Sequence, residues 1–174
     1  KSRSPYLVFL DADDLLAPEF CERLVAVLMR DGRWGFAYCD IHQIFEEDAA
    51  QPARHEAPYS VGASRRLLTG DILPSLLIGG YFPPNSVLVP RRVLDRVGLF
   101  DPDLGGHADW DLWLRIAAAG YPARYVNEKL AYYRLHGENM SRDHEHMRAT
   151  RLRALRKLLG LAPDAMAGAM QGPL

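Results

Sequence analysis

The chain has 174 residues, of which 21 are Lys or Arg and 22 are Asp or Glu, so its formal net charge at pH 7 is −1. That balance excludes a protein held on nucleic acid by a general basic field, and we expect no nucleic-acid partner. Hydrophobic residues make up 48% and charged residues 25% of the chain, which is ordinary for a globular domain and excludes an intrinsically disordered one.

Strand and helix patterns alternate along the chain, which predicts an α/β fold. The apolar run at residues 6–10 predicts a strand buried on both faces. Pro18 and the apolar residues spaced at helical intervals after it predict a helix that ends at Asp31 and Gly32. Further strands are expected at 34–44, 85–89 and 123–136, further helices at 67–77 (interrupted by Pro74), 91–97, 109–119 and 142–159, and a polar surface loop at 46–60.

Membrane and disulfide signals are weak in this sequence. No apolar run approaches the roughly 20 residues of a transmembrane helix, and the run at 6–10 is too short for the core of a signal peptide. Nothing in the spacing of Cys21 and Cys39, the only cysteines, indicates a disulfide framework. We therefore expect a cytoplasmic protein.

Three acids follow the first predicted strand directly. Asp11 and Asp13 are two residues apart, so they face the same way on an extended chain, and Asp14 follows them. In open α/β sheets this end of a strand borders the ligand crevice. Paired carboxylates there suit Mg²⁺ or Mn²⁺, which take their remaining ligands from water and substrate phosphates. The alternative is that the acids only begin the next helix, but three acids in four positions favour a site.

A second group of acids lies at the start of the helix predicted at 109–119. Asp109 would cap this helix and Asp111 would lie in its first turn. Capping explains one acid well and leaves Trp110 and Trp113 unexplained. These two rings are three residues apart, so they share a helix face and belong either to the core or to the wall of a sugar-sized pocket. A carboxylate beside such a wall is suited to act as a general base.

The last predicted strand ends in a third candidate group, Arg134 and His136, which alternate onto one face. An Arg pairs well with diphosphate oxygens, and His136 would complete a metal site or donate to a phosphate. The alternative is an exposed Arg and His at a strand end.

Four motifs in this order resemble the family 2 glycosyltransferases, which have the GT-A fold. They are Asp-Ala-Asp-Asp (11–14), Arg-Arg-Val-Leu-Asp-Arg-Val-Gly-Leu-Phe-Asp (91–101), Asp-Trp-Asp-Leu-Trp-Leu-Arg (109–115) and Tyr-Arg-Leu-His-Gly-Glu-Asn-Met-Ser (133–141). The resemblance runs from about Pro5 to Ser141. It implies a partial GT-A (Rossmann-like) nucleotide-diphospho-sugar transferase fold, with a mixed sheet and flanking helices.

The resemblance also implies a function, which is metal-dependent, inverting transfer of a sugar from a nucleoside-diphosphate sugar to an acceptor hydroxyl. Asp11 and Asp13 would bind the donor ribose and the Mg²⁺ or Mn²⁺ ion, and Arg134 would contact the diphosphate. His136 would be a further metal ligand. Asp109 matches the family's catalytic base.

On the acceptor side the resemblance places Trp110 and Asp111. Ala108 stands where the family usually has Glu, which puts the choice of acceptor in doubt. The acceptor would be a sugar, a lipid-linked sugar or a protein, in polysaccharide, cell-wall or glycoconjugate synthesis. Residues 83–86 would border the donor sugar.

The resemblance divides the chain into three parts. Residues 1–141 would be the C-terminal portion of a GT-A domain, without the strands that hold the nucleobase, and the sheet edge left exposed predicts a homo-oligomer. Residues 142–161 form a basic amphipathic helix that either contacts a membrane surface peripherally or packs on its own domain, and the second reading is favoured. Residues 162–174 are expected to be a flexible tail.

Two other function classes remain open. One is a truncated GT-A remnant that binds a metal or a partner without catalysis. The other is a phosphatase of the haloacid dehalogenase type, which also has Asp-x-Asp after an apolar strand. That motif continues to Thr or Val, whereas this chain has Leu15, so the phosphatase is disfavoured.

Overall fold

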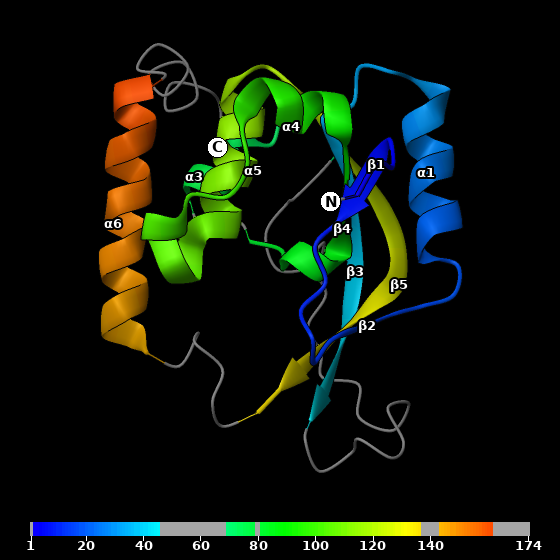
Figure 1. The fold of residues 1–174 in the computed structure, drawn as a ribbon, viewed down its shortest axis with the longest axis horizontal. Helices are drawn as coiled ribbons and strands as arrows, with labels where there is room; N and C mark the ends of the chain where they lie inside the picture. Colours follow the sequence, from blue (N-terminus) through cyan, green and yellow to red (C-terminus); the bar gives the residue numbers. More distant parts are fainter. Residues whose placement is uncertain (1, 46–68, 79–80, 137–142, 162–174) are drawn as a thin grey trace.

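The computed structural model describes residues 2–45, 69–78, 81–136 and 143–161. Its centre is a five-stranded sheet in the order β1-β4-β3-β5-β2 (Figure 1). The strands are β1 (Tyr6–Val8), β2 (Leu15–Leu16), β3 (Phe36–Phe45), β4 (Val87–Pro90) and β5 (Ala123–Leu135). Only β3 and β5 run parallel, and the other three pairings are antiparallel. The predicted α/β class with a mixed sheet is confirmed.

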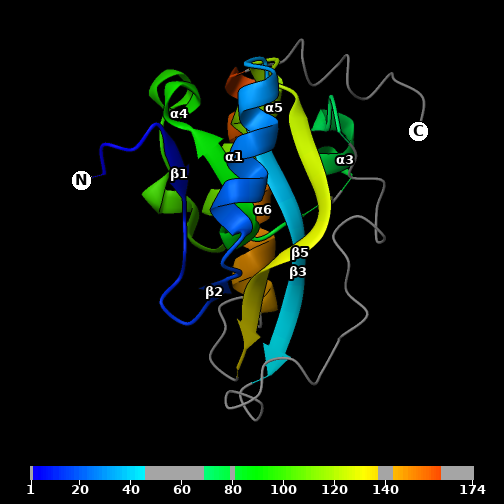
Figure 2. The same cartoon turned by 90° about the vertical axis from the view of Figure 1, so that its right-hand side faces the viewer.

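Helices cover both faces of the sheet. They are α1 (Phe20–Arg30), α3 (Leu73–Leu77), α4 (Arg91–Val97), α5 (Ala108–Ala118) and α6 (His144–Leu161), with 3₁₀ segments η2 (Pro84–Ser86) and η3 (Pro102–His107). In Figure 1, α1 lies on one side of the sheet and α5 on the other, with α6 outside α5; Figure 2 gives the view at right angles. None of the helices in the described ranges is both long enough and apolar enough to cross a membrane.

The core lies between β3 and α5, and large aromatic side chains fill it. Trp113 of α5 has its ring centroid 5.4 Å from that of Phe36 and 5.8 Å from that of Phe82. All three side chains are fully buried. The apolar pattern of α5 therefore fixes which side of the helix faces the sheet.

Most of the predicted elements appear close to their expected positions. Helix α4 has the predicted bounds, and α1, α5, β3 and β5 differ from the prediction by a few residues at most. Pro74 lies in the first turn of α3 and starts this helix instead of interrupting it, because a first-turn residue needs no N–H partner. The loop expected at 46–60 and the tail at 162–174 lie outside the described residues.

The prediction for the first strand was wrong in two respects. Strand β1 has three residues, and all three are half-buried. This half-burial shows that β1 is not fully buried on both faces. It is also an edge strand, because it pairs only with β4. Its short apolar run fits an edge strand equally well, because such a run does not specify how many neighbours a strand has.

Helix α6 packs on its own domain, against η3 and α5. The side chains that it buries there are Thr150, Ala154 and Leu158. Leu152 and Leu159 are 49% and 51% exposed, so the apolar stripe seen in the sequence is only partly used in packing.

Helix α6 also contacts η3 at a glycine. Gly105 of η3 has a φ of +46°, a backbone conformation that favours glycine over other residues. A Cβ atom at this position would lie 2.8 Å from His146 Nε2, at the end of a side chain of α6. The His146 side chain therefore lies against the backbone of η3.

Asp111 anchors α5 to the segment that follows α4. Its side chain is 1% exposed, and its Oδ2 accepts a hydrogen bond of 2.8 Å from Arg115 Nε. The same guanidinium group donates to the backbone oxygens of Val97 (2.6 Å) and Leu99 (2.7 Å). One buried ion pair thus connects two segments of the fold.

Lys157 extends this network to α6. Its Nζ lies 3.0 Å from Asp111 Oδ2 and 2.7 Å from Asp101 Oδ2. Asp111 therefore has two cationic partners, and its loss would leave the largely buried Arg115 guanidinium without a carboxylate, whereas Lys157 would keep Asp101.

We expect Asp111→Ala to lower the free energy of unfolding by about 3 kcal/mol, because removal of one partner of a buried ion pair leaves the other charge unpaired. Urea denaturation measures this change. Asp95→Ala is the matched control, since Asp95 is exposed on α4, and it should change stability by less than about 0.5 kcal/mol. Equal effects of the two variants would contradict the anchoring role.

Candidate functional site

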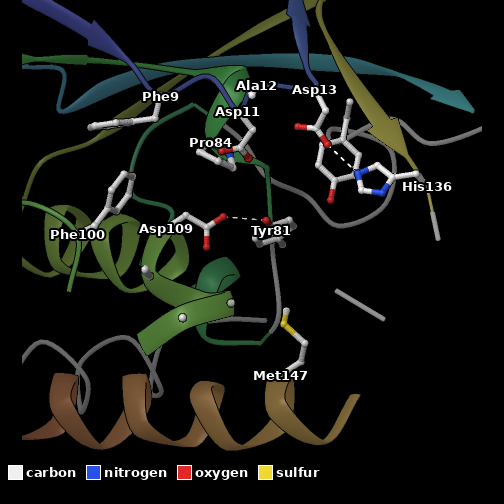
Figure 3. Close-up of a pocket in the computed structure, with 14 residues that line it drawn as sticks. Phe9, Asp11, Ala12, Asp13, Tyr81, Pro84, Phe100, Asp109, His136 and Met147 are labelled. Atoms are coloured by element: carbon white, nitrogen blue, oxygen red, sulfur yellow. Dashed lines mark hydrogen bonds and ion pairs between the residues drawn. The ribbon is translucent and has the colours of Figure 1, made fainter. Parts of the chain in front are cut away.

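A pocket of about 610 Å³ opens beside the end of β1, between the sheet and α5 (Figure 3). Four of the predicted site residues line it, namely Asp11, Asp13, Asp109 and His136. The other lining residues are Phe9, Ala12, Tyr81, Pro84, Phe100, Gly105, Gly106, Ala108, Tyr133 and Met147. Segments far apart in the sequence therefore bring the acids of two motifs into one cavity.

The first two acids of the loop at 11–14, which we call the acidic loop, face this pocket in different electrostatic states. Asp13 Oδ2 lies 2.8 Å from His136 Nε2, and this hydrogen bond holds the pKa of Asp13 below its usual value. Burial raises the pKa of Asp11, and the nearby charge of Asp13 raises it further. The loop therefore concentrates negative charge at the pocket wall.

Asp14 turns away from solvent and fastens the acidic loop to β5. Its side chain is 4% exposed, and its Oδ1 accepts a hydrogen bond of 2.9 Å from the backbone N–H of Arg134. Its Oδ2 is buried without a hydrogen-bond partner among the described residues. Burial raises the pKa of Asp14 to about 6, although the bond from Arg134 opposes this shift.

Arg134 also supports the loop, which differs from its expected role. Its Nε donates to the backbone oxygen of Asp13 at 2.8 Å. Arg134 is not among the residues that line the pocket. In the structure this guanidinium group contacts the backbone of the acidic loop, and its contact with a diphosphate stays a prediction.

Asp109 reaches the pocket from the first turn of α5. Its Oδ2 accepts a hydrogen bond of 2.8 Å from the hydroxyl of Tyr81, and its Oδ1 accepts one of 2.7 Å from the backbone N–H of Trp110. Burial raises its pKa to about 6, although both hydrogen bonds favour the charged form. The N-cap position of α5 belongs to His107, so Asp109 is not the capping residue.

Trp110 and Asp111, expected on the acceptor side, do not line the pocket. Trp110 is 2% exposed, with the edge of His107 on one side and the guanidinium of Arg151 4.9 Å from its ring centroid. Asp111 lies in the ion-pair network described above. Successive helix residues turn by about 100°, so only Asp109 of this group points into the pocket.

Tyr81 is one of the pocket residues that the sequence did not predict. It lies just before Phe82, outside any predicted element, and its ring is 38% exposed. Nothing in the local pattern marks it, because its contact with Asp109 depends on how the loop before η2 folds back onto α5.

The donor side chains of the pocket determine what kind of metal ion it could hold. Within the described ranges, no group of three or more His, Cys, Asp or Glu side chains is arranged to hold a metal ion. Asp13 and His136 offer two donor groups on the pocket wall, and Asp11 adds uncompensated negative charge beside them. This set fits a divalent ion that takes most of its ligands from water and phosphate oxygens, and does not fit a site built wholly from protein.

We expect Tyr81→Phe to raise the pKa of Asp109 above about 6, because the hydroxyl bond stabilises the ionised carboxylate. ¹³C NMR titration of the Asp carboxyl carbons measures this, with Asp109→Asn used to separate the Asp109 signal from that of Asp14. Tyr125→Phe, whose hydroxyl bonds Asn127 instead, should leave the titration unchanged. A lower or unchanged pKa in Tyr81→Phe would refute the assignment.

The chain is similar to known proteins in sequence and in structure. No family model matches the chain. The chain is 30% identical over 142 residues to an uncharacterized glycosyltransferase of Nostoc sp., covering 76% of this chain and 40% of that protein. The structure of TarS from S. aureus (residues 1–349, in complex with UDP) matches with a TM-score of 0.49 and 12% identity, covering 86% of this chain and 41% of that one.

The chain thus spans about two fifths of the length of the curated relative that it matches.

Proposed function

We propose that the protein containing this chain transfers a sugar from a nucleoside-diphosphate sugar to an acceptor hydroxyl with inversion at the anomeric carbon. The observation that carries this proposal is the shared pocket, in which a half-buried carboxylate with a raised pKa, Asp109, faces the same cavity as Asp11 and Asp13. Glycosyl transfer with inversion needs this combination, a base for the acceptor beside a site for the leaving diphosphate.

The acidic loop and the end of β5 would hold the donor. Asp13 and His136 would bind Mg²⁺ or Mn²⁺, and Asp11 would contact the donor ribose. When bound, the ion would neutralise the negative charge that develops on the departing diphosphate. Asp14 and Arg134 position the loop. The Asp14 carboxylate accepts from the backbone N–H of Arg134, and the Arg134 side chain donates to the backbone oxygen of Asp13.

Asp109 would act as the general base. A carboxylate oxygen takes the proton of the acceptor hydroxyl, and the hydroxyl oxygen forms a bond to the anomeric carbon of the sugar. The bond from that carbon to the diphosphate oxygen breaks, and its electron pair leaves with the nucleoside diphosphate. A single displacement of this kind inverts the configuration. The hydrogen bond from Tyr81 does not block the step, because each carboxylate oxygen accepts more than one hydrogen bond.

Several finer points are part of the proposal. The acceptor would be a sugar, a lipid-linked sugar or a protein, used in polysaccharide or glycoconjugate synthesis. Self-association through the edge of β1 and peripheral contact of α6 with a membrane are predictions that gel filtration and vesicle sedimentation test.

We expect Asp109→Asn to lower the rate of nucleoside-diphosphate release from the sugar nucleotide by about 10²- to 10⁴-fold, which is the usual contribution of a general base. In the unaltered protein the rate should rise with pH and level off above about 6, because only ionised Asp109 accepts a proton. Asp95→Asn, at an exposed position of α4, is the matched control. Full activity of Asp109→Asn would disprove the base assignment.

Calorimetry tests the donor site independently of turnover. We expect UDP, GDP or dTDP to bind in the presence of Mn²⁺, and Asp13→Ala or addition of EDTA to abolish this binding, because Asp13 would hold the cation that neutralises the diphosphate and EDTA removes that cation from solution. Asp95→Ala should bind normally. Saturable binding without turnover would favour the catalytically inactive remnant, and the absence of binding by all three nucleotides would count against a donor site.

A further inference from the structure

The pocket has an aromatic end that the proposed chemistry does not yet use. Phe9, just after β1, and Phe100, after α4, have ring centroids 4.4 Å apart with their planes inclined at 58°. Both side chains are half-buried, and both line the pocket. Together they form what we call the aromatic wall.

These two rings differ from the aromatic side chains of the core. Phe36 and Phe82 are fully buried, pack against Trp113, and do not line the pocket. Phe9 and Phe100 pack on the core from outside and keep part of their surface on the cavity. Aromatic surface left open beside carboxylates is typical of a ligand site.

The order of groups along the pocket indicates what the aromatic wall would bind. In Figure 3, Asp13 and His136 lie at one end of the pocket, Phe9 and Phe100 lie at the other, and Asp109 projects between them. A diphosphate belongs at the end with Asp13 and His136. A group held against the aromatic wall therefore lies on the opposite side of the base from the leaving group.

That position is the one an acceptor must occupy. The base removes a proton from the acceptor hydroxyl, so the acceptor lies next to Asp109. A pyranose ring has an apolar face of axial C–H groups that packs on an aromatic ring, and it has hydroxyls at its edge. Its apolar face would lie on Phe9 and Phe100 while one hydroxyl points at the Asp109 carboxylate.

We propose that Phe9 and Phe100 form an acceptor subsite that takes the pyranose ring of a carbohydrate. The assignment of this ring as an acceptor rests on the proposed function, whereas the binding of a sugar ring to the aromatic wall does not. Interactions of both neighbouring residues fix the position of Phe100. Asp101 forms an ion pair of 2.7 Å with Lys157, and the backbone oxygen of Leu99 accepts a hydrogen bond of 2.7 Å from Arg115.

Saturation-transfer NMR on the full chain tests the subsite with defined probes, namely the methyl glycosides of glucose, galactose and N-acetylglucosamine. At least one should bind, with the strongest transfer to its axial ring protons. Phe100→Leu and Phe9→Leu should each weaken this binding about three- to tenfold, the range expected from loss of one aromatic contact. Phe100→Tyr, which keeps the ring, should bind like the unaltered protein.

Leu99→Ala is the matched control, because Leu99 is 66% exposed beside Phe100 and does not line the pocket. It should leave glycoside binding unchanged. Circular dichroism and the urea midpoint identify any Phe variant that has failed to fold. If Phe100→Leu fails to fold, Phe100→Met replaces it, and its glycoside binding is compared with that of Phe100→Tyr.

The inference is overturned if none of the glycosides binds at millimolar concentration, if the folded Phe variants bind them normally, or if these variants weaken binding of UDP with Mn²⁺ and not of the glycoside. Failure of the proposed function looks different. In that case the glycosides bind at the aromatic wall, but UDP, GDP and dTDP do not bind with Mn²⁺ and no nucleoside diphosphate is released from a sugar nucleotide.

Discussion

The candidate site depends on the attachment of the acidic loop to the end of β5. Three contacts make this attachment, from the Arg134 backbone N–H to Asp14, from Arg134 Nε to the Asp13 backbone, and from His136 to the Asp13 carboxylate. They join residues about 120 positions apart in the chain. Without these contacts the three carboxylates of the acidic loop would repel one another and point into solvent. With them, two of the carboxylates are held at the pocket wall while the third is buried.

A second constraint fixes the opposite wall. Asp111, Arg115 and Lys157 hold α5 against α6 and the segment after α4, so the first turn of α5 has one orientation and Asp109 one direction. The two walls thus use acids differently. On the sheet side the buried acid Asp14 positions its exposed neighbours, and on the helix side the buried acid Asp111 positions Asp109. In both places an acid that resembles a ligand in the sequence acts as a support.

Local patterns in the sequence predict much of this fold, because helical periodicity and end signals act over a few residues. Helix α4 has its predicted bounds, and α5 begins one residue earlier than expected. Acids placed directly after a strand or at a helix start were likewise enough to select Asp13 and Asp109, which both line the pocket. Long-range pairing carries no such local signal, so the edge position of β1 and the contact between Tyr81 and Asp109 could not be predicted. The burial of Trp110 and Asp111 away from the pocket could not be predicted for a related reason, since a sequence gives helix spacing but not which face meets the core.

The last described helix also forms part of the pocket, through Met147. The wall that begins at Phe9 is therefore completed only by a residue near the far end of the described chain. During synthesis the acidic loop would leave the ribosome long before β5 and α6 exist to hold it. For that interval its carboxylates are fully hydrated and have no fixed geometry. The geometry of the pocket should thus arise late in biosynthesis, once β5 and α6 have packed against the earlier segments, and not in any early folding unit.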